Sequence, residues 1–224
     1  VRVRRALLGY GLDRLSVARM ALLGLAQPLW SVVPPGSWGH VDVGDPFPYA
    51  PEQAKALLRE AGYGAERPLR YTLTIPAASE LLATVATILQ AQYAQLGVQV
   101  AVESLDRPRF LRRVARDRDW DQLLQVSGEA FGLEAAVRLL DPRAGHNTPN
   151  HQDGQVQALI DRLREAATAE AYGQAGQDLQ RYVTAHMLYP GVTTLPVIQA
   201  AHASVRGYAP GDSIRFEATW LDRP

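Results

Sequence analysis

The stretch that decides the fold is residues 69–102, which read LRYTLTIPAASELLATVATILQAQYAQLGVQVAV. Its first seven residues alternate between apolar and polar side chains, as expected of a half-buried β-strand. Residues 79–96 then place large apolar side chains at helical spacing, and Gly97 follows where such a helix would end. Valines return at alternate positions from 98 to 102, which predicts a second strand. The stretch therefore predicts a β-α-β unit with two parallel strands.

A second helix and a third strand extend this unit. Asp106 is a suitable N-cap for a helix over residues 107–117. The apolar face of that helix is expected to consist of Phe110, Leu111 and Val114. Residues 120–126 (WDQLLQV) are expected to form the third strand, and connections of this length favour right-handed parallel crossovers. The predicted fold class is α/β, a mixed sheet with a parallel β-α-β-α-β core flanked by helices.

Shorter patterns predict helices on both sides of this core. Apolar side chains recur at helical spacing in residues 3–10 and again after Asp13, in a run that Gly24 ends. The second run consists of Leu15, Ala18, Leu22 and Leu23. Five prolines make residues 25–50 a loop, and Pro51 opens a helix that Gly62 ends.

The C-terminal part is expected to be helical and then extended. Asp153 is the expected cap of a helix over 154–166, with a buried stripe of Val156, Leu159, Ile160 and Leu163. A helix over 170–188 follows. Residues 192–198, 202–206 and 214–220 are expected to be extended, the last (IRFEATW) with alternating apolar side chains.

Composition excludes several function classes. The 224 residues carry 23 basic and 23 acidic side chains, so the net charge is zero. The charge balance therefore gives no indication of a nucleic-acid partner or an anionic membrane partner. The absence of cysteine excludes disulfides and thiolate metal sites. The catalytic motifs G-x-S-x-G, H-E-x-x-H, G-x-G-x-x-G and the P-loop are absent, and no cofactor is expected.

Several segments, taken in order, resemble the large C-terminal lobe of family 5 extracellular solute-binding proteins. They are VRVRRAL at the N-terminus, the VVPPGSW loop, AKALLREAGY, LGVQV, QVQALIDRLREA and the terminal RFEATWL. The resemblance implies a type II periplasmic-binding-protein-like lobe. The chain is then a fragment in which residues 1–194 form the large lobe. Residues 195–224 are expected to cross back to an N-terminal lobe that the sequence lacks.

The resemblance also implies the function. Such a protein captures an oligopeptide or similar small solute in the periplasm or outside the cell. It delivers the solute to the membrane permease subunits of an ABC-type importer, and it is not an enzyme. Because the tail carries large apolar residues that expect cover, we also predict self-association through residues 195–224 in the isolated chain.

The candidate ligand site lies where the third strand ends, because ligands of parallel α/β sheets collect beyond the carboxyl ends of the strands. It consists of Ser127, Gly128, Glu129 and Phe131, with Trp38 contributed by the VVPPGSW loop. In the family this turn carries a Trp and an Asp that pairs with a peptide amino group. Here Ser127 stands at the Trp position and Ala130 near the Asp position, with Glu129 beside it. Glu129 is either the ligand carboxylate or a solvated turn residue, and Trp38 either stacks on ligand or pins its own loop.

Other readings stay open. A hydrolytic enzyme domain and a protein-interaction module are the alternative functions. His146, His151 and Asp153 suggest a metal site, but their spacing fits no helical ligand pair and Asp153 is better used as a cap. The arginine stripe of residues 107–117 is read as a solvated helix face, with permease docking as its alternative. It consists of Arg109, Arg112, Arg113 and Arg116.

Overall fold

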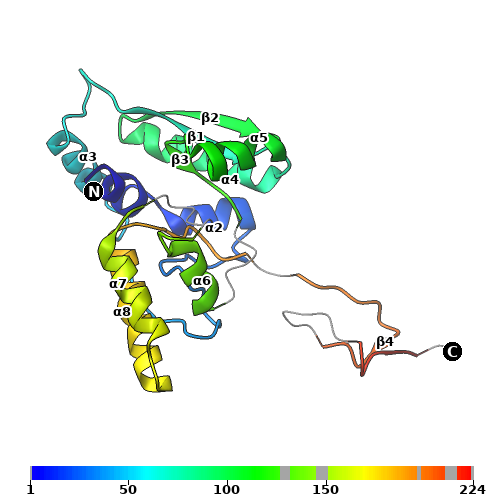
Figure 1. Cartoon of the computed structure of the whole chain (residues 1–224). Coiled ribbons are helices and arrows are strands. Elements are labelled where there is room, and N and C mark those ends of the chain that lie inside the picture. Colours follow the sequence, from blue (N-terminus) through cyan, green and yellow to red (C-terminus); the bar gives the residue numbers. More distant parts are fainter. Residues whose placement is uncertain (1, 127–131, 145–150, 196–197, 210–215, 223–224) are drawn as a thin grey trace. The chain divides into compact units, whose positions relative to one another are not determined.

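Figure 1 shows a computed structural model of the chain, which describes residues 2–126, 132–144, 151–195, 198–209 and 216–222. The chain forms two compact units, Val1–Thr194 (unit 1) and Leu195–Pro224 (unit 2).

A three-stranded parallel sheet forms the centre of unit 1. Its strands are β1 (Arg70–Pro76), β2 (Gln99–Leu105) and β3 (Gln122–Leu123), in the order β2-β1-β3. In register, Leu73 of β1 lies opposite Val102 of β2 and Gln122 of β3. Helix α4 (Glu80–Gln95) connects β1 to β2 and packs on both strands (Figure 1). The predicted parallel β-α-β-α-β core is therefore confirmed.

Two details of the sheet differ from the prediction. The third strand was expected over 120–126, but only Gln122 and Leu123 pair as a strand, with Leu124 N–H donating to the Thr74 carbonyl at 3.1 Å. Thr74 was expected on the polar face of a half-buried strand but is 0% exposed. The reason is topological, because β1 lies between two neighbours and is covered on both faces.

The second crossover is helical as predicted but changes its winding. It comprises α5 (Arg107–Leu111) and a π-helical segment η2 (Arg112–Asp117), and the Asp106 side chain caps α5 by accepting from Arg109 N–H. Phe110 is buried, but Leu111 is 49% exposed, so its expected place on the apolar face is wrong. The π-helical turn that begins at Arg112 rotates the faces of the segment relative to a regular helix.

The N-terminal helices begin and end close to their predicted positions. They are α1 (Arg2–Arg4), the π-helical η1 (Arg5–Tyr10), α2 (Arg14–Leu22) and α3 (Pro51–Glu60). Asp13 caps α2 as expected, and Ala18 of the predicted apolar run is buried. The prediction is wrong for Leu15 and Leu23, which are exposed, whereas Arg14 and Val17 are buried in their place. Tertiary hydrogen bonds to Arg14 set this face, and helical spacing alone does not reveal them.

A second core lies beside the sheet core within unit 1. Helices α7 (Gly154–Arg164) and α8 (Ala169–Ala185) lie side by side (Figure 1), and helix α6 (Leu133–Leu140) and the Val32–Val33 segment pack on them. All four residues of the predicted α7 stripe are buried, and Asp153 caps α7. Helix α6 is not among the helices expected from the sequence, which indicates a ligand turn at residues 127–131 and no element directly after it.

Unit 2 is small and carries little regular structure. Its strands β4 (Val205–Arg206) and β5 (Trp220–Leu221) pair in antiparallel fashion. The strand expected over 214–220 is wrong for residues 216–219, because residues 217–218 form a turn, and only Trp220 of that range lies in β5. Phe216, Trp220 and Leu221 are 66%, 57% and 53% exposed. Among the helices in the described ranges of the chain, none has the length and apolar character to cross a bilayer.

Candidate functional site

The carboxyl ends of β1 and β2 lie next to each other, as the site prediction requires. Pro76 and Leu105 are in register, and Ala77 N–H donates to the Leu105 carbonyl at 2.7 Å. The polar side chains that follow both strands are used as helix caps. Ser79 Oγ accepts from Leu82 N–H at 3.2 Å, and the Asp106 carboxylate accepts from Arg109 N–H at 2.9 Å. These two strand ends therefore offer side chains that are already committed to helix α4 and helix α5.

The end of β3 leads into the main candidate segment. Val126, the last described residue before it, is 47% exposed. Ser127, Gly128, Glu129 and Phe131 lie outside the described residues, so their assignment to a ligand site stays a prediction. The structure describes the two flanks of the segment, Val126 on one side and Gly132 on the other.

The downstream flank lies against the Trp38 loop. Leu133 N–H donates to the Trp38 carbonyl at 3.2 Å. Gly132 has a φ of +85°, and a Cβ there would lie 3.1 Å from the Trp38 carbonyl oxygen, so a side chain at this position would be strained and crowded. The structure thus brings the backbone of Trp38 to the residue that directly follows the 127–131 segment.

Leu133 fixes this junction to the second core. Its side chain is 1% exposed and sits between two glycines from distant parts of the chain. A Cβ at Gly39 would lie 2.9 Å from Leu133 Cβ, and a Cβ at Gly176 would lie 2.2 Å from Leu133 Cδ2. Because neither glycine carries a side chain, Leu133 can fill the space between the Trp38 loop and α8. The sequence indicated Gly39 only as a turn residue of the 25–50 loop and gave Gly176 no role.

The Trp38 side chain contacts α8 and is also largely exposed, while its stacking on a ligand stays a prediction. Its ring is 67% exposed, and its centroid lies 5.4 Å from that of Tyr172 at an interplanar angle of 35°. The contact with Tyr172 holds the ring on α8, and the exposed face is available to a further group. Tyr172 also borders a surface cavity of about 360 Å³ that Glu134 and Arg164 line. Burial, and then the Glu134 carboxylate, raise the pKa of Tyr172.

Gln180 of α8 holds the loop that carries Trp38. It is 0% exposed, and its Nε2 donates to the Gly39 carbonyl at 2.7 Å and to the Gly176 carbonyl at 3.1 Å. Its Oε1 accepts from Ser31 Oγ at 2.8 Å and from Val41 N–H at 3.2 Å. One amide therefore uses two donors and two acceptor sites, which is its full capacity. A glutamine inside the apolar stripe of the 170–188 helix was the only sequence signal for this anchor.

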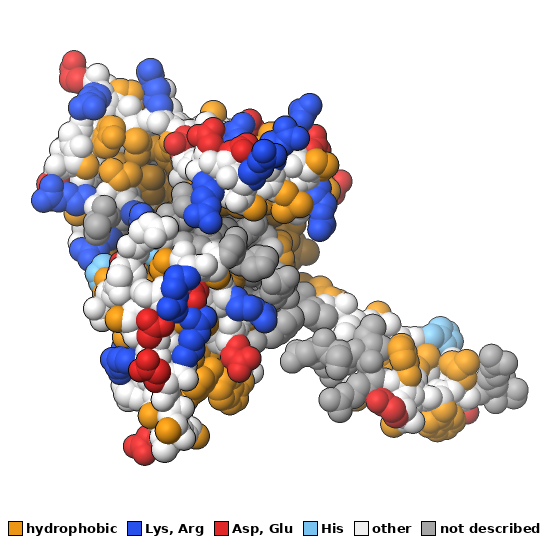
Figure 2. Space-filling view, viewed as in Figure 1, with side chains coloured by type: hydrophobic (Ala, Val, Ile, Leu, Met, Phe, Trp, Pro, Cys, Tyr) orange, Lys and Arg blue, Asp and Glu red, His pale blue; other side chains and the backbone are white. Residues whose placement is uncertain are grey.

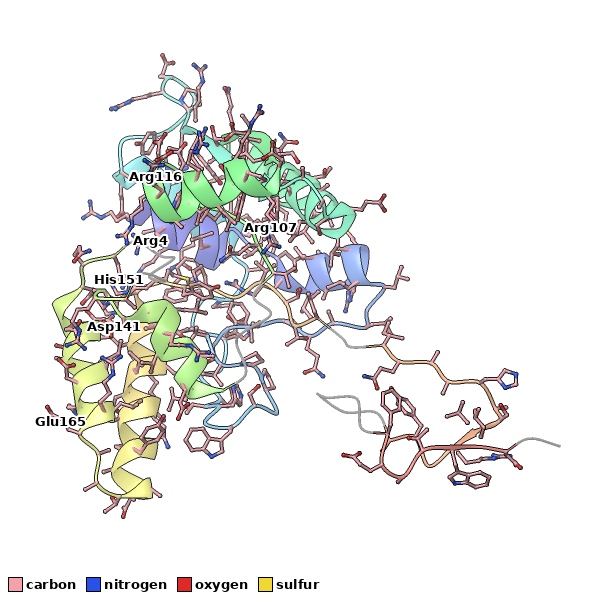
Figure 3. All side chains as sticks on the ribbon, turned by 45° about the vertical axis from the view of Figure 1, so that its right-hand side comes forward. Arg4, Arg107, Arg116, Asp141, His151 and Glu165 are labelled. Carbon is pink, nitrogen blue, oxygen red and sulfur yellow. The ribbon has the colours of Figure 1, made fainter. Side chains whose placement is uncertain are left out.

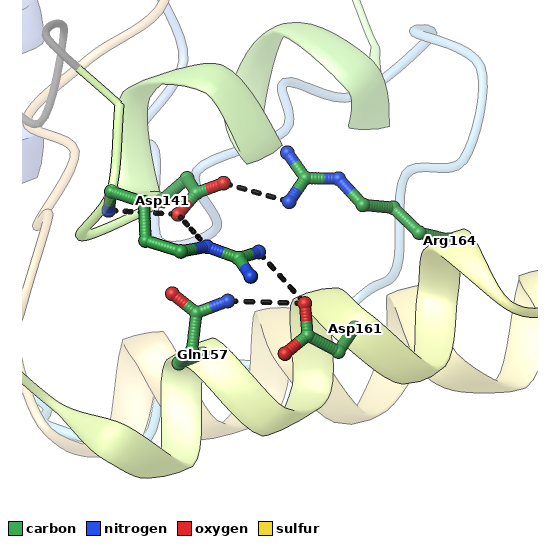
Figure 4. Close-up of polar contacts among 5 residues, drawn as sticks. Asp141, Gln157, Asp161 and Arg164 are labelled. Carbon is green, nitrogen blue, oxygen red and sulfur yellow. Dashed lines mark hydrogen bonds and ion pairs between the residues drawn. The ribbon is translucent and has the colours of Figure 1, made fainter.

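A network of charged side chains joins the end of α6 to α7 (Figure 4). Asp141, 3% exposed, pairs with Arg143 at 3.2 Å and with Arg164 at 2.8 Å, and Arg143 also pairs with Asp161 at 2.7 Å. Burial alone would raise the pKa of Asp141, but hydrogen bonds from Arg143 and Arg164 hold it below its ordinary value. With both oxygens bound to arginines, Asp141 is a structural carboxylate rather than a ligand.

His151 lies close to this network and to Arg4 (Figure 3). Its Nδ1 accepts from Asp153 N–H at 3.2 Å, and Asp153 caps α7. Burial lowers the pKa of His151. His146 lies outside the described residues. Among the parts of the chain that are described, no three His, Asp or Glu side chains gather in a way that would hold a metal ion.

The arginine stripe carries both paired and exposed members. Arg113 pairs with Glu103 at 3.0 Å and Arg109 with Asp106 at 3.4 Å, both at least partly exposed. Arg107 and Arg116 lie towards opposite ends of the α5–η2 segment (Figure 3). Figure 2 shows basic and acidic side chains interspersed over the upper part of this face. Such a mixed face fits the solvated reading of the stripe.

Comparison with known proteins gives the family. Residues 1–135 match the middle region of the bacterial extracellular solute-binding proteins, family 5. The di/tripeptide-binding protein 2 of Pseudomonas aeruginosa is 33% identical over 113 residues, which are 50% of this chain and 21% of that protein. The glutathione-binding protein GsiB of Salmonella typhimurium is 35% identical over 107 residues, 47% of this chain and 20% of that protein.

Solved structures show the same fold. NikA of Brucella suis superposes with a TM-score of 0.84 and 20% identity, covering 98% of this chain and 47% of its own. The murein tripeptide binding protein MppA of Escherichia coli gives a TM-score of 0.82 and 20% identity, covering 98% and 45%. The chain thus spans less than half the length of these structures, and about a fifth of each curated relative is aligned to it. By its match over residues 1–135, the chain belongs to family 5 of the bacterial extracellular solute-binding proteins.

Proposed function

We propose that this chain is one lobe of a two-lobed receptor, which captures a small solute outside the cytoplasm and delivers it to an ABC-type importer. The observation that carries the proposal is the family match over residues 1–135. The fold adds support, because nearly the whole chain superposes on less than half of NikA and on less than half of MppA. Solute binds between the lobes, and contacts to both lobes at once favour closure.

The solute class that we propose is a short peptide or peptide-like molecule. The aligned relatives are named for di- and tripeptides and for glutathione. On this chain, Ser127, Gly128, Glu129 and Phe131 form the ligand turn after β3, with Glu129 pairing with a cationic group of the solute. Trp38 contributes its exposed ring. The support for grouping them is that Trp38 contacts Gly132 and Leu133, which directly follow the turn.

The tail has a place in the same proposal. Residues 195–224 cross back to the other lobe, and membrane permease subunits receive the closed receptor. Support comes from the large apolar side chains that unit 2 leaves exposed, Phe216 and Trp220 among them, since such groups are normally covered in a complete protein. In the chain by itself, the same side chains favour self-association through the tail.

The test is calorimetric titration of the two-lobed protein with di- and tripeptides and glutathione. We expect micromolar or tighter binding of at least one of them. Glu129→Gln should weaken a peptide with a free amino group by about 1.5–3 kcal/mol, the value of a hydrogen bond to a charged group. An N-acetylated copy of the same peptide is the matched control, and its affinity should not depend on Glu129. An unchanged affinity for the free peptide would return Glu129 to an ordinary turn residue, and equal losses for both peptides would show that Glu129 does not pair with the amino group. No binding of any peptide would refute the solute class.

A further inference from the structure

The chain leaves unit 1 from a short antiparallel ladder between two segments far apart in sequence. Pro28 bridges to Thr193, Thr194 N–H donates to the Gln27 carbonyl at 2.8 Å, and Leu29 N–H donates to the Val192 carbonyl at 3.2 Å. Thr194 is the last residue of unit 1. Pro28 and Thr193 are the non-hydrogen-bonded pair of this ladder, so the missing N–H of proline costs it no bond. With only a few bonds, so short a ladder is marginal on its own and gains from support from outside.

Arg14 supplies that support from the first turn of α2. Its Nε donates to the Gly191 carbonyl at 2.9 Å, and its guanidinium carbon lies 3.9 Å from the ring centroid of Trp30. Gly191 directly precedes the Val192 strand of the ladder, and Trp30 directly follows the Leu29 strand. Arg14 therefore touches the chain at the same end of both ladder strands.

A second nitrogen of the same guanidinium binds η1, whose Leu8 packs against the sheet core. Arg14 Nη2 donates to the Leu8 carbonyl of η1 at 2.8 Å. Backbone groups of the neighbouring Asp13 bind Gln92 of α4, with N–H to Oε1 at 3.0 Å and Nε2 to the carbonyl at 3.2 Å. Since α4 packs on β1 and β2, these bonds connect the ladder to the centre of unit 1 through α2.

The close approach of the two ladder segments is a second, independent sign of a fitted junction. A Cβ at Gly191 would lie 2.6 Å from Leu29 Cγ and 2.9 Å from the Leu29 carbonyl oxygen. The side chain of Arg14 is 3% exposed and both of its acceptors are backbone carbonyls. Burying a cation costs free energy unless its partners compensate for the lost water. The planar guanidinium of Arg14 binds two carbonyls and stacks on an indole at once, which a lysine or methionine side chain cannot do.

We propose that Arg14 is a positioning residue that fixes the place where the chain leaves unit 1. On the proposed two-lobed function, on which this last step rests, that place is one anchor of the hinge about which the lobes close. The role is local: Arg14 holds the ladder in register, and it is not needed to hold the sheet together.

Amide hydrogen exchange of the whole chain, followed by NMR, separates a local role from general stability. The amides of Leu29 and Thr194 report on the ladder, and Gln99 N–H, bound to the Leu69 carbonyl at 2.9 Å, reports on the sheet. In Arg14→Met, exchange at Leu29 and Thr194 should accelerate at least tenfold while Gln99 stays within threefold. Arg14→Lys should do the same, because charge without the planar fork does not bridge the two carbonyls.

Arg19→Met is the matched control, since Arg19 lies exposed on the same helix, and it should change none of the three amides. If Arg14→Met does not fold, Arg14→Lys and Gly191→Ala still decide, because each should loosen the same two ladder amides. Unchanged ladder exchange, or equal acceleration of all three amides, would overturn the proposal. No solute is used, so the outcome is independent of the peptide titration that tests the proposed function.

Discussion

Replacing Gly176 by alanine should destabilise unit 1, whereas the same replacement at Gly173, one turn earlier on α8, should stabilise it. A Cβ at Gly176 would lie 2.2 Å from Cδ2 of Leu133, while a Cβ at Gly173 meets nothing within 4 Å. Leu133 is 1% exposed and has Gly39 against its other side, so it has little room to move away. Both variants add one methyl group to the same helix, Gly173→Ala in open space and Gly176→Ala in a packed core.

The magnitudes follow from two opposing effects. Replacing glycine by alanine inside a helix contributes about 1 kcal/mol of stability. Forcing an extra methyl group into a packed core costs about 1–3 kcal/mol. Gly173→Ala should therefore raise the free energy of unfolding by about 1 kcal/mol. Gly176→Ala should lower it by up to about 2 kcal/mol, the difference between overpacking and helix propensity.

Urea unfolding followed by far-ultraviolet circular dichroism measures both values. A double-mutant cycle with Leu133→Ala identifies the partner, since removing the Leu133 side chain should cancel most of the cost of Gly176→Ala, a coupling of about 0.5–3 kcal/mol. If Gly176→Ala is as stable as Gly173→Ala, Leu133 does not fill the space between the two glycines. The end of the 127–131 segment would then lack the anchor described above.

Three further predictions concern the rest of unit 1. Gln180→Met should lose about 2–4 kcal/mol of stability, because four hydrogen bonds of about 1 kcal/mol each disappear. The control is Gln174→Met at an exposed position of the same helix, which should cost under about 0.5 kcal/mol, and equal urea midpoints for the two variants would contradict the Gln180 anchor. Leu23→Gly should stabilise unit 1 by about 0.5–1 kcal/mol, because Leu23 has a left-handed φ of +53° and, at 86% exposed, gives up little buried surface. Thermal unfolding should show a higher Tm, and a lower Tm would contradict this reasoning. The free energy of unfolding should decrease as the pH is lowered below 6.5, the ordinary pKa of His151, and again below 3.8, that of Asp141, because each pKa is lower in the folded chain than in the unfolded one. Urea midpoints that do not change between pH 7 and pH 3 would show that neither shift is coupled to folding.

Local signals in the sequence placed most elements correctly. Asp13, Asp106 and Asp153 each cap the helix that was expected after them, and the four-residue stripe of α7 is buried in full. Caps and stripes depend on residues within one or two turns, so the sequence contains all that is needed to find them.

Features that depend on distant partners could not be predicted. Arg14 is buried because its acceptors include the Gly191 carbonyl, 177 positions away. Gln180 is buried because several of its partners, such as Ser31 and Gly39, lie on the loop between α2 and α3. Leu111 is exposed in α5, and the π-helical winding of the segment that follows it is not visible in local helical spacing. For the candidate site, the sequence indicated the Trp38 loop and the turn after β3, but not the glycine pair around Leu133 that joins them.

The comparison that tests the central claim most directly is the affinity of one tripeptide for residues 1–224 and for the two-lobed protein. Half of the contacts of a two-lobed cleft lie on the other lobe, so the chain by itself should bind at least about 100-fold more weakly, a difference of about 2.8 kcal/mol. Isothermal titration calorimetry gives both dissociation constants under the same conditions. We predict micromolar or tighter binding by the two-lobed protein only, and equally tight binding by residues 1–224 would contradict the account.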